Sequence, residues 1–66
     1  MDVGSRIRFY RKAQKLMQYE LASRLGMARS QLSRYETGRT QPGLRALARI
    51  SKVLGVPVSD FLPHGE

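Results

Sequence analysis

Apolar residues recur along the chain at the three- and four-residue spacing of amphipathic helices, and they alternate nowhere for long enough to make a strand. The first such segment, about 3–14, places Val3, Ile7 and Tyr10 on one face. The same spacing predicts further helices at about 18–25, 29–37 and 44–54, and a last short helix at about 58–62. The pattern therefore predicts an all-α fold of five short helices.

Glycine and proline mark the boundaries of these helices. Gly26 and Gly55 follow the last apolar position of a predicted helix, where a left-handed residue commonly ends the helix. Pro42 and Pro57 stand just before two predicted helices, where a missing N–H costs little. Because the connections are short and no repeat or linker interrupts them, we expect a single domain over residues 1–66.

Length and composition limit what these helices can do. The chain has 66 residues and no cysteine, and no apolar run exceeds three residues, which excludes a disulfide, a thiolate metal site and a membrane span. The N-terminus lacks the apolar segment of a secretion signal, so we expect a cytoplasmic protein. The only histidine is His64, and no serine has a partnered histidine. We therefore expect no metal, no cofactor and no enzymatic activity.

The charge of the chain is large and unevenly distributed. The formal net charge is +7, and 11 of the 12 basic residues lie between Gly4 and Arg49, where only Glu20 and Glu36 are acidic. Nine of the basic residues are arginines, whose planar donors suit phosphates and guanine edges. This bias predicts a polyanionic partner. A basic amphipathic helix on a membrane is the alternative, but the frequent helix ends argue against it.

The most informative segment is 18–37, in which two helices of about eight residues are separated by the short turn 26–28. This arrangement is typical of a helix-turn-helix. Ala22 is small where the two helices must cross closely, and the glycine that opens the turn can adopt a left-handed conformation. If Leu32 faces the core, the opposite face of 29–34 stays exposed and can enter a major groove.

This segment and its flanks resemble the phage lambda repressor and Cro-like helix-turn-helix domains, also called the xenobiotic-response-element type. The resemblance covers residues 4–62. Its elements, in chain order, are Arg6-Ile7-Arg8 with Arg11, Gln18-x-Glu-Leu-Ala, Gly26, Leu32-Ser33-x-x-Glu36-x-Gly38, Pro42, Leu47-x-x-Ile50 and Leu54-Gly55-Val56. The resemblance implies a sequence-specific regulator of transcription, acting as a repressor, that binds double-stranded DNA as a homodimer.

The resemblance also implies roles for individual residues. The residues implied to contact bases are Arg29, Ser30, Ser33 and Arg34. Those implied to contact the DNA backbone are Gln18, Ala28, Arg39 and Thr40, with Arg6 and Arg8 adding positive charge from the first helix. An arginine that donates two hydrogen bonds to guanine contributes about 1–3 kcal/mol of discrimination. The alternative is that these arginines are simply solvated.

Arg11 and Glu36 have a different implied role. In similar proteins these positions form a partly buried ion pair that joins the first helix to the third. The pair holds the recognition helix in place and does not contact DNA.

The chain departs from the pattern of this family at several helix ends. Met17, Ala28 and Gly43 stand where a capping side chain is usual, and Lys15 stands where a glycine often ends the first helix. Each lost serine or threonine cap costs roughly 1 kcal/mol, so we expect modest stability.

Two questions stay open at the level of the sequence. Val58, Phe61 and Leu62 either form a dimer interface or only cap the core. The alternative functions are a protein-interaction module, such as an antitoxin with a toxin or effector as its partner, and a non-specific or RNA-binding basic protein. The polar face of 29–34 favours base reading over a protein partner, and it lacks aromatic side chains that would stack on single-stranded bases.

Overall fold

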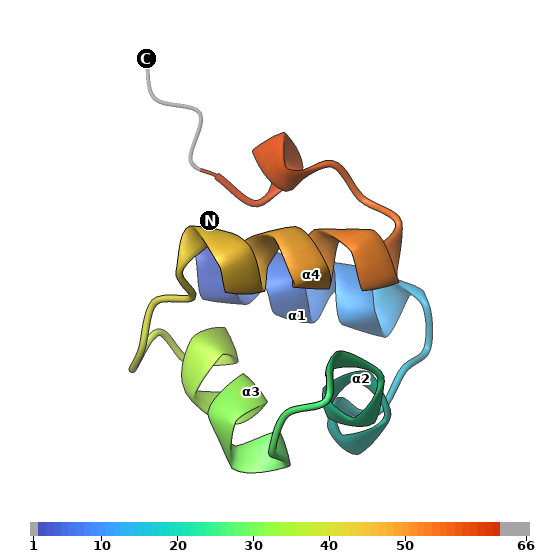
Figure 1. The fold of residues 1–66 in the computed structure, drawn as a ribbon. Coiled ribbons are helices and arrows are strands. Elements are labelled where there is room, and N and C mark those ends of the chain that lie inside the picture. Colours follow the sequence, from blue (N-terminus) through green and yellow to red (C-terminus); the bar gives the residue numbers. More distant parts are fainter. Residues whose placement is uncertain (1, 63–66) are drawn as a thin grey trace.

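The computed structural model describes residues 2–62, which form four α-helices and one 3-10 turn (Figure 1). The helices are α1 (Val3–Ala13), α2 (Gln18–Leu25), α3 (Arg29–Glu36) and α4 (Leu44–Leu54), and the 3-10 turn η1 spans Val58–Asp60. The all-α prediction is confirmed, and the bounds of the four α-helices agree with the predicted ones to within one residue. Within the described residues, no helix has the length and apolar character needed to cross a membrane.

The predicted fifth helix at 58–62 is wrong. This segment forms only a three-residue 3-10 turn, in which the Asp60 N–H donates to Pro57 O and the Phe61 N–H donates to Val58 O, both at 2.9 Å. Five residues between two prolines offer too few partners for the longer-range hydrogen bonds of an α-helix. Short apolar segments of this kind commonly close as 3-10 turns.

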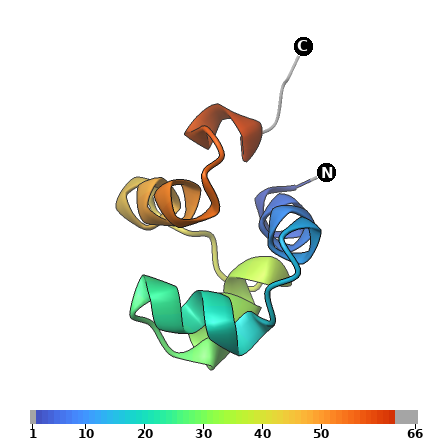
Figure 2. The ribbon, with the colours of Figure 1, turned by 90° about the vertical axis from the view of Figure 1, so that its right-hand side faces the viewer.

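The four helices form two levels. In Figure 2, α4 and α1 lie at opposite sides of the upper level, and α2 and α3 lie beneath them. α3 packs against both α1 and α2. The face of α3 that points away from α1 and α2 is left to solvent.

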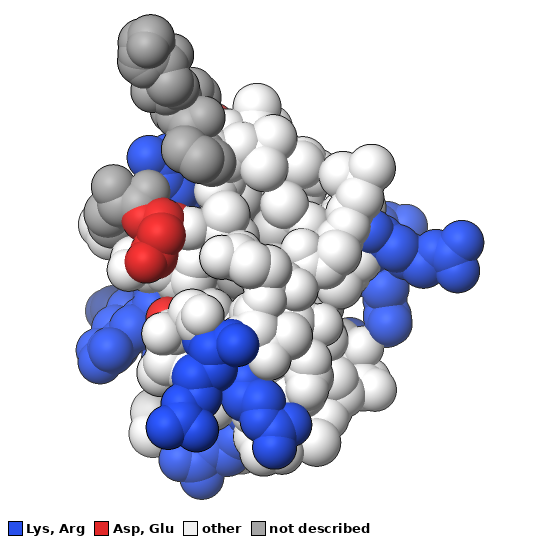
Figure 3. Space-filling model, turned by 90° about the vertical axis from the view of Figure 1, so that its left-hand side faces the viewer, with Lys and Arg blue, Asp and Glu red and all other residues white. Residues whose placement is uncertain are grey.

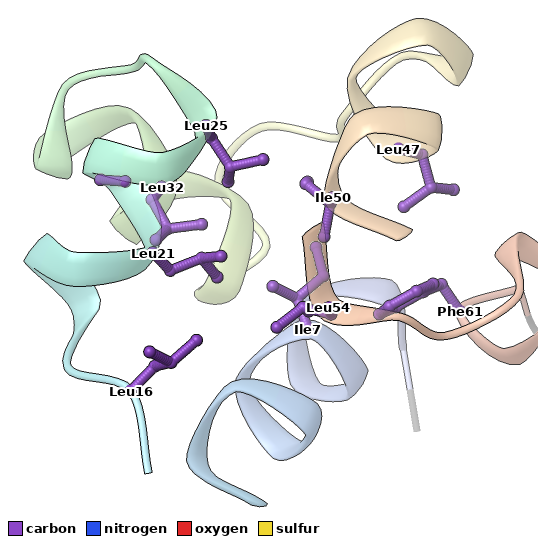
Figure 4. Packing of buried hydrophobic residues seen from close by; sticks show 10 residues of the cluster. Ile7, Leu16, Leu21, Leu25, Leu32, Leu47, Ile50, Leu54 and Phe61 are labelled. Atoms are coloured by element: carbon purple, nitrogen blue, oxygen red, sulfur yellow. The ribbon is translucent and has the colours of Figure 1, made fainter. Parts of the chain in front are cut away.

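The core lies between these two levels (Figure 4). Its ten buried apolar residues are Ile7, Leu16, Leu21, Ala22, Leu25, Leu32, Leu47, Ile50, Leu54 and Phe61. Leu32 is fully buried, as predicted from the helix-turn-helix pattern. Full burial of one such aliphatic side chain contributes about 1.5–3 kcal/mol, so this cluster supplies most of the driving force for folding.

The helix N-termini are capped unevenly. At α1, the Asp2 carboxylate accepts from the Ser5 N–H at 2.8 Å, and this hydrogen bond lowers the pKa of Asp2. The stabilisation from this cap is therefore present above the unfolded pKa and is lost as the pH falls. As predicted, no side chain caps the N-termini of α2, α3 and α4. At α2, Glu20 compensates in part by accepting from the Met17 N–H at 2.7 Å.

Two helix C-termini are stabilised by side chains from distant parts of the chain. Arg49 of α4 donates to Leu25 O at the end of α2, at 2.6 Å. Gln14 donates to Leu54 O at the end of α4. The last carbonyl groups of a helix have no partner within it, and these contacts satisfy two of them. The contact of Arg49 joins the two levels, whereas that of Gln14 joins α1 to α4 within the upper level.

Lys15 adopts a left-handed conformation, with φ of 58°, between α1 and α2. This conformation costs a non-glycine residue about 1–2 kcal/mol. Glycine removes that strain but gains freedom in the unfolded chain, which offsets part of the benefit. We expect Lys15→Gly to raise the free energy of unfolding in urea by about 0.5–1 kcal/mol. Lys12→Gly inside α1 is the control and should lower it by about 1 kcal/mol; a loss of stability in both variants would contradict the assignment of strain.

Candidate nucleic-acid interface

The outer face of α3 carries polar and basic side chains. Arg29, Ser30 and Arg34 are exposed and Ser33 is half-buried, whereas Leu32 on the inner face is fully buried. Residues three and four positions apart share one face of an α-helix. The structure therefore brings the four predicted base-contacting residues together on the side of α3 that no other helix covers.

Gln18, the first residue of α2, links this face to the interior of the molecule. Its Oε1 accepts from Nε of Arg29 at 3.2 Å, and its Nε2 donates to Oε1 of Glu36, also at 3.2 Å. Both ends of the amide are thus engaged within the protein. Because only Nε of Arg29 is held, the two terminal amino groups of that guanidinium stay available to a ligand.

Arg11 and Glu36 form a buried ion pair between α1 and α3. Nε and Nη2 of Arg11 donate to the two carboxylate oxygens of Glu36 at 2.7 and 3.0 Å, and each residue is 7% exposed. Nη1 of Arg11 donates to Leu16 O at 2.8 Å. Paired donors on a carboxylate fix its orientation, so the pair sets where the last turn of α3 lies relative to α1.

A cleft of about 620 Å³ opens between α1 and the α2–α3 pair. Arg8 and Lys12 line it from α1, Tyr19 lines it from α2, and Arg29 and Thr37 line it from α3 and its C-terminal end. Arg8 therefore lines the same cleft as Arg29. Lys12 and Tyr19 were not expected here, although Lys12 is one helical turn after Arg8, a spacing that the sequence shows. Arg11 also lines the cleft but is paired with Glu36, which leaves three cations without an acidic partner there. This charge favours an anionic partner.

The chain after α3 carries two further predicted contacts. Arg39 and Thr40 are exposed in the loop that follows Gly38, whose φ of 79° allows the chain to turn. Ala28, before α3, is exposed and offers no side-chain hydrogen bond. Figure 3 views the molecule from the side of this loop and shows basic side chains along the lower edge and on both flanks, with few acidic ones between them.

Two predicted groups lie away from this surface. Nη1 of Arg6 donates to Asp60 O and Leu62 O at 3.2 and 3.3 Å, so this side chain lies against the C-terminal turn. Phe61 is fully buried and packs edge-on against a tyrosine ring of α1, with 5.5 Å between ring centroids. Phe61 therefore belongs to the core, which is the second of the two alternatives that the sequence left open for it. Leu62 is 41% exposed and Val58 is half-buried.

The part of the chain that the structure describes contains no group of three histidine, cysteine or acidic side chains that could hold a metal ion. His64 lies outside the described residues. The absence of a metal and of a cofactor stays a prediction.

Sequence reasoning missed Gly4, which is buried in the first turn of α1. A Cβ at this position would lie 2.7 Å from the carbonyl oxygen of Glu36 and closer still to that of Tyr35. Only glycine therefore lets α1 approach the C-terminal turn of α3 this closely. The signal in the sequence is a glycine inside a predicted helix. Such a glycine lowers the stability of the helix, so its presence indicates a position where close packing requires it.

Residues 7–61 match the helix-turn-helix family. The chain is similar to an uncharacterized HTH-type transcriptional regulator of Sinorhizobium medicae, with 42% identity over 61 residues that cover 92% of this chain and 44% of the relative. It is also similar to the immunity repressor protein of Bacillus phage phi105, with 41% identity over 59 residues that cover 89% of this chain and 41% of the relative. The chain thus spans less than half the length of these two curated relatives.

The fold is similar to that of SinR from Bacillus subtilis, a master regulator for biofilm formation whose crystal structure was solved in complex with DNA. The TM-score is 0.86 and the sequence identity 37%, over 92% of this chain and 98% of the SinR chain.

Proposed function

Because this chain belongs to the lambda repressor/Cro-like helix-turn-helix family, we propose that it is a transcriptional regulator that binds double-stranded DNA sequence-specifically and acts as a repressor. The observation that carries the proposal is the exposed outer face of α3, on which Gln18 holds Arg29 by its Nε at 3.2 Å. A side chain oriented before binding loses less conformational freedom when it meets its ligand.

In this proposal α3 lies in the major groove. The two terminal amino groups of Arg29 donate to O6 and N7 of a guanine. Arg34, five residues later, contacts a second base. Ser30 and Ser33 are compact enough to let the helix approach the base edges, and their hydroxyl groups donate or accept as the base requires.

The DNA backbone is held from both ends of α3. Arg39 and Thr40 contact phosphates from the loop, while Arg8 contacts them from α1, joined by Lys12 in the same cleft. The side chain of Gln18 is engaged within the protein, so its phosphate contact uses the backbone N–H of the first turn of α2, where the helix dipole favours an anion. Ala28 contributes in the same way through its backbone.

We further propose that two copies bind as a homodimer, reading half-sites about 34 Å apart. Val58 and Leu62 are the remaining candidates for the contact between the copies, since Phe61 is fully buried. Residues 1–66 act as a single domain that carries no catalytic activity and needs no cofactor. Because its proposed partner is DNA, the protein acts in the cytoplasm, where that DNA lies.

The experiment that tests the proposal is selection of bound sequences from random duplex DNA, followed by alanine variants. Arg29→Ala and Arg34→Ala should each lose about 1–3 kcal/mol of discrimination at one base-pair position. Arg39→Ala is the control, because a phosphate contact should weaken binding to all sequences alike and lower the slope of log affinity against log salt by about one. Equal losses on selected and random DNA for all three variants would contradict the assignment of base contacts.

A further inference from the structure

α4 carries a second set of basic side chains. Arg45, Arg49 and Lys52 follow one another at intervals of four and three residues, so they share one face of the helix, and all three are exposed. We call these three residues the α4 stripe. α4 and α1 lie at opposite sides of the molecule in Figure 2, and Figure 3 shows a group of basic side chains at the right that uncharged surface separates from those at the left and lower edge. None of the three residues of the stripe lines the cleft beside α1.

Contacts within the protein leave most of this charge uncompensated. Among residues 2–62, Arg11 and Glu36 form the only ion pair. Within the same residues, neither Arg45 nor Lys52 has a hydrogen-bond partner. Arg49 donates through Nη2 to Leu25 O, a neutral acceptor. Neighbouring like charges repel one another, so three cations without an acidic partner on one face cost stability.

The length of the stripe matches a nucleic-acid backbone. Seven residues of α-helix span about 10 Å, and one DNA strand carries about three phosphates over that length. The centre of a protein interface is rich in aromatic and other large apolar side chains. The stripe has none between its cations, where Ala48 is exposed, and the exposed Leu44 lies at its N-terminal end. Its chemistry therefore favours phosphates over a protein surface.

We propose that the α4 stripe binds the phosphate backbone of a second DNA duplex, so that one molecule bridges two DNA segments. In Figure 2, α4 lies on the side of the molecule opposite α1, so in this proposal a duplex that contacts α3 and Arg8 leaves the outer face of α4 for a second duplex. Contacts of this kind carry no sequence information, because they involve only phosphates. The inference goes beyond the proposed function, which requires one duplex.

A two-duplex capture assay tests this proposal. A biotinylated random duplex of about 20 base pairs, roughly two helical turns, is saturated with protein on beads, and a fluorescent duplex of the same length is then added. We expect the wild type to capture the second duplex. The double variant Arg45→Gln/Lys52→Gln should still bind the bead-bound duplex, but the slope of log capture against log salt should fall by about two.

The double variant Lys15→Gln/Arg24→Gln is the matched control, because it also removes one exposed lysine and one exposed arginine charge, from the loop after α1 and from α2. Capture should survive in this control. The proposal is overturned if the wild type binds one duplex but captures no second one. It is also overturned if the α4 variant captures as well as the wild type, as it would if two copies of α3 in a dimer bound separate duplexes.

A preference for a fluorescent polyglutamate peptide over the second duplex would overturn the proposal in favour of a protein partner. These outcomes are separable from failure of the proposed function. That function fails if selection yields no preferred sequence, whereas bridging by the α4 stripe requires only phosphates.

Discussion

Glu36→Ala is expected to lower the free energy of unfolding by about 3–5 kcal/mol, because it leaves the buried charge of Arg11 without its partner. For a domain of this size, 1 kcal/mol corresponds to about 4–8 °C in the melting temperature. The melting curve followed by circular dichroism should therefore shift down by at least roughly 12 °C, and the variant is expected to be largely unfolded at physiological temperature. A melting curve like that of the wild type would contradict the structural role of the pair.

The double variant Arg11→Met/Glu36→Leu separates the loss of the pair from the stranding of one charge. Replacing both charges by apolar side chains of similar size is often neutral or stabilising, so this variant should melt well above Glu36→Ala. It should nevertheless bind selected DNA less specifically than the wild type. Without Glu36, Nε2 of Gln18 has no acceptor, and the amide of Gln18 is no longer fixed. Gln18 then no longer holds the guanidinium of Arg29 in one orientation. Unchanged specificity in the folded double variant would show that this chain of hydrogen bonds does not reach the recognition face.

Gly4→Ala is expected to destabilise the domain by about 1–3 kcal/mol, although alanine is the better helix former by about 1 kcal/mol. The new methyl group would lie within 2.7 Å of the Glu36 carbonyl oxygen, and that oxygen belongs to the backbone of a helix and not to a flexible side chain. α1 and α3 must therefore move apart, which disturbs both packing and the ion pair between them. Urea unfolding of the purified variant measures the effect.

Gly43→Ala is the matched control for Gly4→Ala, because a Cβ at Gly43 would meet nothing within 4 Å and its φ is −68°. It should change stability by less than about 1 kcal/mol, the size of an N-cap effect. If Gly4→Ala were as stable as Gly43→Ala, the close approach of α1 to α3 would not be a constraint on the sequence.

The four α-helices were predictable because each buries a stripe of apolar side chains at a regular spacing. Leu32 could be assigned to the core in this way, since it has polar neighbours on both sides. The segment after Pro57 could not be assigned in this way. Its apolar residues Val58 and Phe61 fit a helix, a cap on the core or an exposed patch equally well. Only the tertiary structure, which seats the Phe61 ring against α1, decides between these possibilities.

The exposure of Arg29 and Arg34 on α3 was predictable from the helical spacing, and their contact with bases stays a prediction. The candidate site was less predictable where a polar side chain chooses between solvent and the protein. Arg6 was expected at phosphates because of its charge, but it lies against backbone carbonyl groups of the C-terminal turn. Gln18 was expected to bind phosphate through its amide, which instead links two other side chains. Spacing in the sequence does not report such long-range partners.

The contacts of Arg49 and Gln14 with the ends of distant helices have a consequence for how the molecule folds. α2 and α3 have eight residues each and lack side-chain caps at their N-termini, so neither would persist as an isolated peptide in water. The partner that completes the end of α2 comes from α4, and the partner that completes α4 comes from the far end of α1. Each helix therefore becomes stable only when the others are already in place. Folding should be a single all-or-none transition in which the recognition helix forms together with the whole domain.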